Sequence, residues 1–337
     1  MIIIKNIYSK IVNFIKNNLK SLIFLIILTF LCWYELPYQI YIPGGIINLS
    51  TRVEVEDGYS YTGSLNSSYV SALKGTIPFV LASKIIPDWD LVKNEQVTIE
   101  NEKLSEAIAR DRELLKESLT ISQMVALNMA NIKYDIVKTH VKILYVYSKS
   151  FSNLQVNDEI LEIDSAKINN DQEFRNIIRE KNKDDAVSIK ILRDNKEMTV
   201  ESRFYEEDGR VLLGVYATTS YDIKTPMKIS VKSKSSESGS SGGFMTTLAI
   251  YNSLVSKDIT KGKKIVGTGT IDLNGNVGEI GGVKYKLMGA VNNKADIFLC
   301  PEENYEEAMK IKKEKNYSID IYAINNIENA IKLLENM

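Results

Sequence analysis

Helical and extended segments alternate along the chain from Tyr221 to its last residue, and this order restricts the fold of the region. The extended segments KKIVGTGTI and ADIFLCP are rich in β-branched and aromatic residues. The segments that follow them, VKYKLMGAVNN and NYEEAMKIKKEKN, carry apolar residues at helical spacing. Because such alternation is typical of α/β proteins, residues 206–337 are predicted to form an α/β (α+β) domain.

A run of serine and glycine, KSKSSESGSSGG, separates an extended segment of this domain from the helical segment GFMTTLAIYNSL. As local sequence the run is typical of a flexible linker. Its position before a helix also allows a second interpretation, in which the amides of Gly242 and Gly243 face a group bound near Ser241. Ser241 would then be a nucleophile with an oxyanion site beside it.

A serine nucleophile needs a base, and the chain has a single histidine, His140, inside the strand-like run THVKILYV. Lysine is therefore the expected base. Lys284 and Lys286 follow a glycine pair and lie roughly 200° apart on a helix, so both cannot face one serine. A cysteine–histidine pair of Cys300 with His140 is a weaker alternative, because both lie in apolar strand segments.

Two motifs give the region a family resemblance. GSSGG at 239–243 is similar to the GPSAG nucleophile loop of the Lon proteolytic domain, and TGTIDLNGNVGEIGGVKYK at 268–286 matches the pattern TG-I---G-V--IGG---K without a gap. The chain resembles the Lon peptidase family S16, and more closely its membrane-anchored, PDZ-containing Lon-like serine proteases of Gram-positive-type bacteria. The resemblance implies a catalytic set of Ser241 as nucleophile, Lys286 as base and Thr268 orienting the lysine, with a loop formed by Gly239, Ser240, Gly242 and Gly243.

The loop departs from the family at two positions. Ser240 replaces the usual proline and Gly242 the usual alanine, which makes the loop more flexible. For Lys286 to accept a proton near pH 7, burial must lower its pKa from about 10.4, and a drop of ~3 units corresponds to roughly 4 kcal/mol.

Residues 137–205 have the order strand, turn, amphipathic helix and two strands, and LQVNDEILEIDSAKI resembles the signature of PDZ domains. In that family a peptide adds as an extra strand between the first strand and the helix. The resemblance implies a β-rich PDZ-like domain with a peptide-binding groove. The candidate groove residues are Leu144, Tyr145, Val146, Tyr147, Phe174, Ile177 and Ile178.

The segment from Leu19 to Tyr34 is nearly unbroken in apolar residues; three lysines precede it, a fourth, Lys20, stands at its start, and no acidic residue precedes it. We expect residues 19–38 to form an uncleaved transmembrane helix, with residues 1–18 as a basic cytoplasmic N-terminus and the catalytic domain extracellular. Residues 39–136 are predicted to form a β-rich neck followed by a long helix from about Glu102 to Ala130. The protein is thus expected to be a single-pass protein of the cell membrane.

Charge and cysteine content exclude several functions. The chain has 42 Lys and Arg against 43 Asp and Glu, so no basic field attracts nucleic acid. Its two cysteines are too few for a zinc cluster, so no metal is predicted. It contains no GxxxxGK[ST] motif, which disfavours a nucleotide-binding regulator, and no cofactor is expected.

These observations predict an ATP-independent serine endopeptidase that cleaves flexible or unfolded proteins, with the PDZ-like domain recognising substrate. The resemblance to Lon also implies a homo-oligomer, namely a hexamer. The alternative is a catalytically inactive, membrane-tethered PDZ scaffold that binds protein partners. Retention of serine, threonine and lysine together favours the enzyme.

Overall fold

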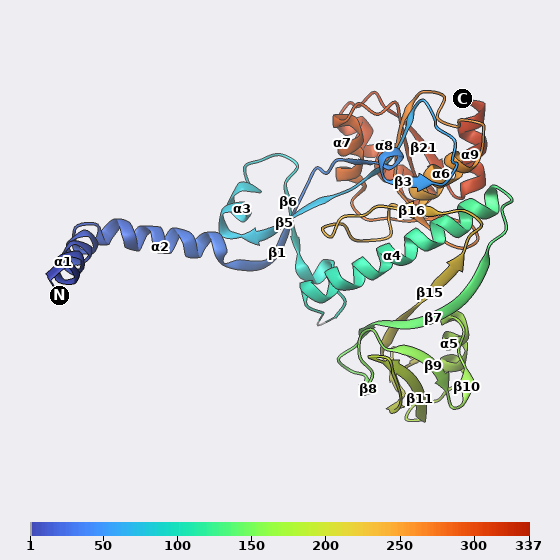
Figure 1. The fold of residues 1–337 in the computed structure, drawn as a ribbon, viewed down its shortest axis with the longest axis horizontal. Coiled ribbons are helices and arrows are strands. Elements are labelled where there is room, and N and C mark those ends of the chain that lie inside the picture. The colour runs from blue at the N-terminus through green and yellow to red at the C-terminus, as the bar shows by residue number, and fades with distance from the viewer. Residues whose placement is uncertain (1, 101) are drawn as a thin grey trace. The chain divides into compact units, whose positions relative to one another are not determined.

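The computed structural model describes residues 2–100 and 102–337. The chain divides into two compact units (Figure 1). The first comprises residues 1–43 and 71–96, and the second comprises residues 44–70 and 97–337. Each unit is therefore built from two separate stretches of sequence.

The first unit combines helices with a small antiparallel sheet. Its helices are α1 (Ile2–Asn17), α2 (Leu19–Trp33) and α3 (Ile77–Ala82), and a short 3-10 turn covers Asn94–Gln96. Its sheet has the order β5 (Ser71–Thr76), β1 (Glu35–Ile42) and β6 (Asp90–Lys93). Ile40, near the centre of the paired part of β1, is fully buried and has a strand partner on each side.

The predicted transmembrane helix at residues 19–38 is wrong. Among the residues that the structure describes, none lies in a helix that is both long and apolar enough to cross a membrane. Helix α2 has 15 residues, or roughly 22 Å at ~1.5 Å per residue, whereas a bilayer core is about 30 Å thick. After Trp33 the chain turns extended and forms β1, where Pro37 cannot continue a helix. The single-pass membrane localisation that rested on this helix is wrong with it.

The second unit is built around a five-stranded sheet that carries the predicted α/β order. The strand order is β2 (Ile46–Asn48), β4 (Ser64–Ser68), β17 (Lys264–Gly267), β20 (Ile297–Pro301) and β21 (Asp320–Ile324). The pair β2–β4 is antiparallel, and the other three pairs are parallel. Residues 44–70, expected as part of a β-rich neck, thus supply two strands of this sheet.

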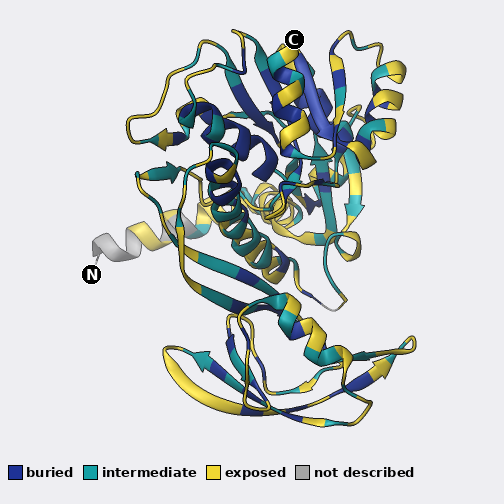
Figure 2. Cartoon of the chain, turned by 90° about the vertical axis from the view of Figure 1, so that its right-hand side faces the viewer, coloured by how far each residue is buried: buried dark blue, intermediate teal, exposed yellow. Residues whose placement is uncertain are grey.

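Helices cover both faces of the five-stranded sheet. Helices α6 (Gly243–Leu254) and α9 (Ile327–Asn336) pack on one face with Ile265 and Leu299, and helices α7 (Val283–Asn292) and α8 (Glu302–Glu314) pack on the other with Val266 and Phe298. Side chains that alternate along β17 and β20 therefore enter opposite cores, which explains why these strands read as continuous apolar segments. The buried residues concentrate in this sheet and the helices beside it (Figure 2).

A long helix, α4 (Leu104–Met129), adds a further layer against α6. Its last turns contribute Val125 and Ala126 to the core that surrounds α6. The helix predicted from about Glu102 to Ala130 is present with almost these bounds.

Residues 135–224 form a second sheet with its own core. Its strand order is β15 (Val215–Lys224), β7 (Asp135–Val146), β9 (Glu159–Ile163), β11 (Ala186–Arg193), β12 (Lys196–Arg203) and β8 (Phe151–Ser152), with β10 (Ala166–Lys167) beside β9. Helix α5 (Asp171–Arg179) packs Phe174 into this core. The order strand, turn, helix and two strands predicted for this region is the observed one.

Short two-stranded ladders complete the second unit. They pair β13 (Tyr205–Glu207) with β14 (Arg210–Leu212), β3 (Val53–Val55) with β16 (Ile229–Val231), and β18 (Thr270–Ile271) with β19 (Val277–Gly278). A 3-10 turn at Leu49–Thr51 follows β2.

Candidate active site

The serine and glycine run forms an ordered turn at the start of α6. Gly242 is the N-cap residue of α6, and Gly239 adopts a φ of 87°, a conformation that favours glycine. Phe244, Met245 and Leu248 on α6 are fully buried. The helix is thus fixed in the core, and its N-terminus holds Ser241 at the carboxyl edge of the sheet.

The two residues that directly follow β17 hold the backbone of Ser241 by hydrogen bonds. The Thr268 hydroxyl donates to the Ser241 carbonyl at 3.0 Å, and the Gly269 amide donates to the same oxygen at 2.8 Å. The Phe244 amide donates in turn to the Gly269 carbonyl at 3.1 Å. Because Thr268 directly follows β17 and is fully buried, these bonds fix the Ser241 turn to the sheet.

Helix α4 holds the other side of the same turn. The Gly239 amide donates to the Asp111 carbonyl at 2.8 Å, the Ser118 hydroxyl to the Ser240 carbonyl at 3.2 Å, and the Ser122 hydroxyl to the Gly243 carbonyl at 2.9 Å. The sequence reasoning missed this helix as part of the site. Its signal is the spacing of the three α4 residues by seven and four positions, which places them on one helical face.

The free amides of the turn differ from those predicted. The Gly243 amide, expected at the oxyanion, donates to the Ser240 carbonyl at 3.0 Å and closes the turn. The amides of Ser241 and Gly242 donate to no group in the described part of the chain. These two amides lie at the N-terminus of α6, where a developing negative charge is stabilised.

Lys286 lies on the first turns of α7, and burial distinguishes it from Lys284. Its side chain is 4% exposed, and burial lowers its pKa to about 8. Lys284 is half-buried, with its amine 5.4 Å from the centre of the Tyr285 ring. Of the two lysines that the sequence offered, Lys286 has the environment that brings the pKa of an amine toward physiological pH, as a general base requires.

The start of α7 lies at the same edge of the sheet as the start of α6. The N-cap of α7, Gly282, lies against the Val70 side chain, two residues beyond β4. The Ser241 turn is fixed to Thr268, directly beyond β17, and β4 and β17 are parallel neighbours. Both helix N-termini therefore converge at the carboxyl ends of adjacent strands, where ligand sites of open α/β sheets form.

The lysine is not hydrogen-bonded to its predicted partners. Among residues 2–100 and 102–337, no hydrogen bond joins the Lys286 amine to Ser241 or to Thr268. The Thr268 hydroxyl uses its proton on the Ser241 carbonyl and keeps its lone pairs to accept from an amine. Thr268 thus contacts the backbone of Ser241 directly, which the motif did not indicate.

The predicted peptide groove is filled by the chain itself. Strand β15 pairs antiparallel with β7, placing Val215 opposite Val146 and Tyr216 opposite Tyr145. It also contacts α5, since the Thr219 hydroxyl accepts from the Asp171 amide at 2.7 Å. Of the other candidate groove residues, Leu144 and Phe174 are buried. Ile177 and Ile178 are partly buried and pack against the core of this sheet. Strand addition at this place therefore requires β15 to move.

Other candidate chemistry is separated in the fold. His140 lies on β7, and its ring Nε2 is 3.0 Å from the Asp222 carboxylate of β15. Cys300 lies in the core of the five-stranded sheet. Burial raises the pKa of the Cys300 thiol to about 12, so it is no nucleophile. Within the described ranges, no three His, Cys, Asp or Glu side chains are grouped to hold a metal ion.

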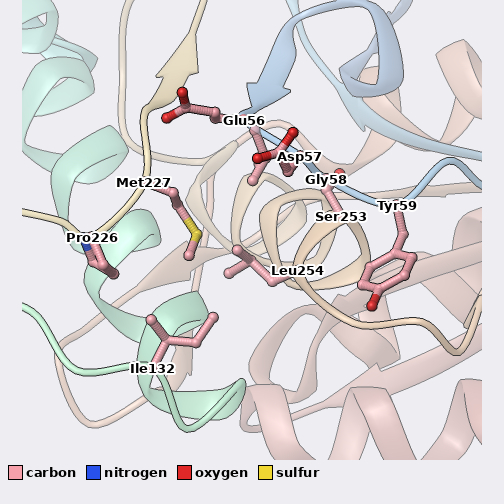
Figure 3. Close-up of a pocket in the computed structure, with 10 residues that line it drawn as sticks. Glu56, Asp57, Gly58, Tyr59, Ile132, Pro226, Met227, Ser253 and Leu254 are labelled. Carbon is pink, nitrogen blue, oxygen red and sulfur yellow. The ribbon is translucent and has the colours of Figure 1, made fainter.

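Figure 3 shows a cavity of about 440 Å³. It lies at the C-terminal end of α6, whereas Ser241 directly precedes the N-cap of this helix. Ser253 and Leu254 from the end of α6 line it together with Glu56, Tyr59 and Met227. With twelve residues in α6, roughly 18 Å of helix separate it from the nucleophile turn. It contains none of the proposed catalytic residues.

Comparison with known proteins identifies the two regions. Residues 222–336 match the family described as Lon protease (S16) C-terminal proteolytic domain, and residues 130–203 match the PDZ domain family. The first range contains Ser241, Thr268 and Lys286. The chain therefore has one region that matches the Lon-type proteolytic domain and another that matches the PDZ domain.

The individual relatives are similar over short segments. The Lon protease of Buchnera aphidicola is 36% identical over 99 residues, covering 29% of this chain and 12% of that protein. The Lon protease of Rickettsia felis is 34% identical over 86 residues, covering 25% and 11%. The chain thus spans about a tenth of the length of the curated relatives it matches.

The similar solved structures cover the other region. The PDZ domain of the SdrC-like protein from Listeria monocytogenes is 23% identical and covers 23% of this chain and 85% of that one, with a TM-score of 0.22. The corresponding domain from Listeria innocua is 27% identical and covers 23% and 92%, also with a TM-score of 0.22.

Proposed function

We propose that this protein is an ATP-independent serine endopeptidase with a dyad of Ser241 and Lys286. The observation that carries the proposal is a buried lysine with a pKa lowered to about 8, at the sheet edge where the amides of Ser241 and Gly242 donate to no group among the described residues. Burial of an amine with no carboxylate partner among the described residues destabilises the folded protein, and such perturbed groups cluster at functional sites. The PDZ domain beside the Lon-type domain resembles the PDZ-containing Lon-like proteases of Gram-positive-type bacteria.

In this mechanism the Ser241 oxygen attacks the carbonyl carbon of the scissile peptide bond, and its proton passes to the neutral Lys286 amine. The carbonyl oxygen becomes an oxyanion that accepts hydrogen bonds from the Ser241 and Gly242 amides. The C–N bond then breaks, and the leaving amine takes the proton from Lys286. Water attacks the acyl-enzyme, returns a proton through Lys286 to Ser241, and releases the carboxylic acid.

The lowered pKa of Lys286 makes the proton transfer feasible at neutral pH. With a pKa of about 8, roughly one lysine in ten is neutral at pH 7, against about one in three thousand at 10.5. Thr268 is proposed to orient the amine with its free lone pairs while its proton holds the Ser241 carbonyl.

The proposed substrates are flexible or unfolded protein segments. The sequence carries no phosphate-binding loop, so no step of the proposal uses ATP. The PDZ domain is proposed to position substrate by strand addition at β7 after β15 has moved. Assembly as a homo-oligomer, a hexamer by resemblance to Lon, is part of the same proposal and is tested by sedimentation.

The decisive test is cleavage of an unfolded protein such as reduced casein, with and without ATP, by the full chain and by single variants. We expect Ser241→Ala and Lys286→Met to lose at least about 10³-fold in kcat. Lys284→Met, the matched control on the same helix, should keep wild-type activity. Equal cleavage by wild type and Ser241→Ala would refute the protease.

The second candidate is a catalytically inactive PDZ scaffold. It is favoured by the missing hydrogen bond between Lys286 and Ser241 within the described chain. A serine-reactive fluorophosphonate distinguishes the two, because only an activated Ser241 is labelled. Labelling that disappears in both Ser241→Ala and Lys286→Met supports the enzyme.

A further inference from the structure

Ser67, on β4, is a buried residue whose hydroxyl has no part in the bonds that hold the site together. It is 6% exposed, and its hydroxyl has no hydrogen-bond partner in the part of the chain that the structure describes. The side chains of its neighbours on β4 are hydrogen-bonded to the adjacent strand β17. The side-chain amide of Asn66 donates to the Ile265 carbonyl at 3.0 Å, and the Ser68 hydroxyl donates to the Gly267 carbonyl at 3.2 Å. Ser67 alone of these three polar side chains is left without a structural bond.

Strand geometry places Ser67 on the α6 face of the sheet. Side chains alternate along a strand, so Ser67 shares its face with Leu65, which packs in the same core as α6. A Cβ atom built on Gly242 would lie 3.0 Å from the Ser67 hydroxyl oxygen. The Ser67 hydroxyl therefore lies at the N-terminus of α6, beside the unpaired Gly242 amide.

This position belongs to the oxyanion side of the site. Lys286 is carried by α7, which packs on the opposite face of the sheet with Val266 and Phe298. The free amides of Ser241 and Gly242 are on the α6 side, together with Ser67. The Ser67 hydroxyl has one proton to donate in a hydrogen bond. Since a helix N-terminus stabilises negative charge, an oxyanion that forms there is the expected acceptor.

We propose that Ser67 is a third hydrogen-bond donor to the oxyanion of the scissile carbonyl, together with the amides of Ser241 and Gly242. The hydroxyl donates without transferring its proton, so it changes no bond in the reaction. The proposal rests on the proposed protease function and adds a catalytic residue from a strand about 170 positions before the nucleophile.

The same contact explains one departure of the nucleophile turn. The Lon family has alanine where this chain has Gly242, and a methyl group there would press on the Ser67 oxygen at 3.0 Å. That distance is tighter than ordinary carbon–oxygen contacts, so the hydroxyl would have to turn away. Gly242 and Ser67 are therefore expected to act as a pair.

The experiment compares Ser67→Ala with Ser68→Ala, the next residue on the strand, whose hydroxyl points to the other face. Peptide cleavage gives kcat and KM, and a peptide boronate, which forms a tetrahedral adduct, reports affinity for the transition-state geometry. We expect Ser67→Ala to lower kcat by about 10²-fold with little change in KM. Boronate affinity should fall by a similar factor, whereas Ser68→Ala keeps all three values.

A double-mutant cycle with Gly242→Ala tests the pairing. Gly242→Ala should lower kcat in the wild-type chain but have little further effect in Ser67→Ala, because the hydroxyl it displaces is already absent. If Ser67→Ala cleaves within about threefold of wild type while Ser241→Ala is inactive, the proposal for Ser67 is refuted and the protease stands. If the wild type itself neither cleaves nor binds the boronate, both are refuted.

Discussion

Replacing the buried lysine should stabilise the protein while it abolishes activity. In the folded chain Lys286 has a pKa of about 8, against 10.5 when unfolded, because burial disfavours its charged form. The unfolded chain therefore binds more protons between these two values, and stability rises as the pH increases from 8 to 10.5. Below pH 8 the buried ammonium destabilises the folded state.

The two pKa values determine, by thermodynamic linkage, how much the buried lysine lowers the free energy of unfolding. The destabilisation is about 3 kcal/mol at pH 7 and about 1 kcal/mol at pH 10. Lys286→Met keeps most of the side-chain volume and removes the charge, so it should recover these amounts. Lys284→Met, at a half-exposed position of the same helix, should change stability by less than about 0.5 kcal/mol at either pH.

The measurement must report on the right part of the chain. Both tryptophans, Trp33 and Trp89, lie in the first unit, so their fluorescence would not follow the five-stranded sheet. Hydrogen exchange of the β17 and β20 amides under urea reports the unfolding free energy of that sheet directly. The assignment of Lys286 as a base with a lowered pKa would be refuted if Lys286→Met raised the free energy of unfolding equally at pH 7 and pH 10, or did not raise it at pH 7.

Three further predictions concern residues around the same core. Burial raises the pKa of Glu117 from 4.5 to about 7, so stability should fall by about 3 kcal/mol between pH 4 and pH 8 in urea titrations, and Glu117→Gln should remove this slope. Gly243→Ala should abolish cleavage, because its Cβ would lie 2.4 Å from the Ser118 oxygen; Gly243→Ala combined with Ser118→Gly should restore part of it, and full activity of the single variant would contradict the packing. Thr268→Val removes the bond to the Ser241 carbonyl and should lower kcat at least tenfold, with Thr268→Ser retaining most activity; equal rates for both would exclude a role of the hydroxyl.

The fold of the C-terminal region could be predicted because its signals are local. Apolar strands such as β20 and helices such as α7 follow one another within a few residues, so their alternation is visible in the sequence. The prediction failed at α2, where an apolar segment has the composition of a membrane helix but ends after 15 residues as the chain enters β1. The apolar composition indicated that the segment avoids water. The length of the helix was decided by β1, which begins at Glu35 and pairs with the distant strands β5 and β6.

The chemical candidates could be named from the order of amino acids alone: one serine in a glycine-rich turn and two lysines after a glycine pair, in the pattern of a Lon-type domain. Only the tertiary structure distinguished Lys286 from Lys284, because burial depends on which side of α7 meets the sheet. It also brought Ser67 beside Gly242 and laid β15 along β7. These contacts join residues far apart in the chain, and their energies arise only when the strands and helices pack together.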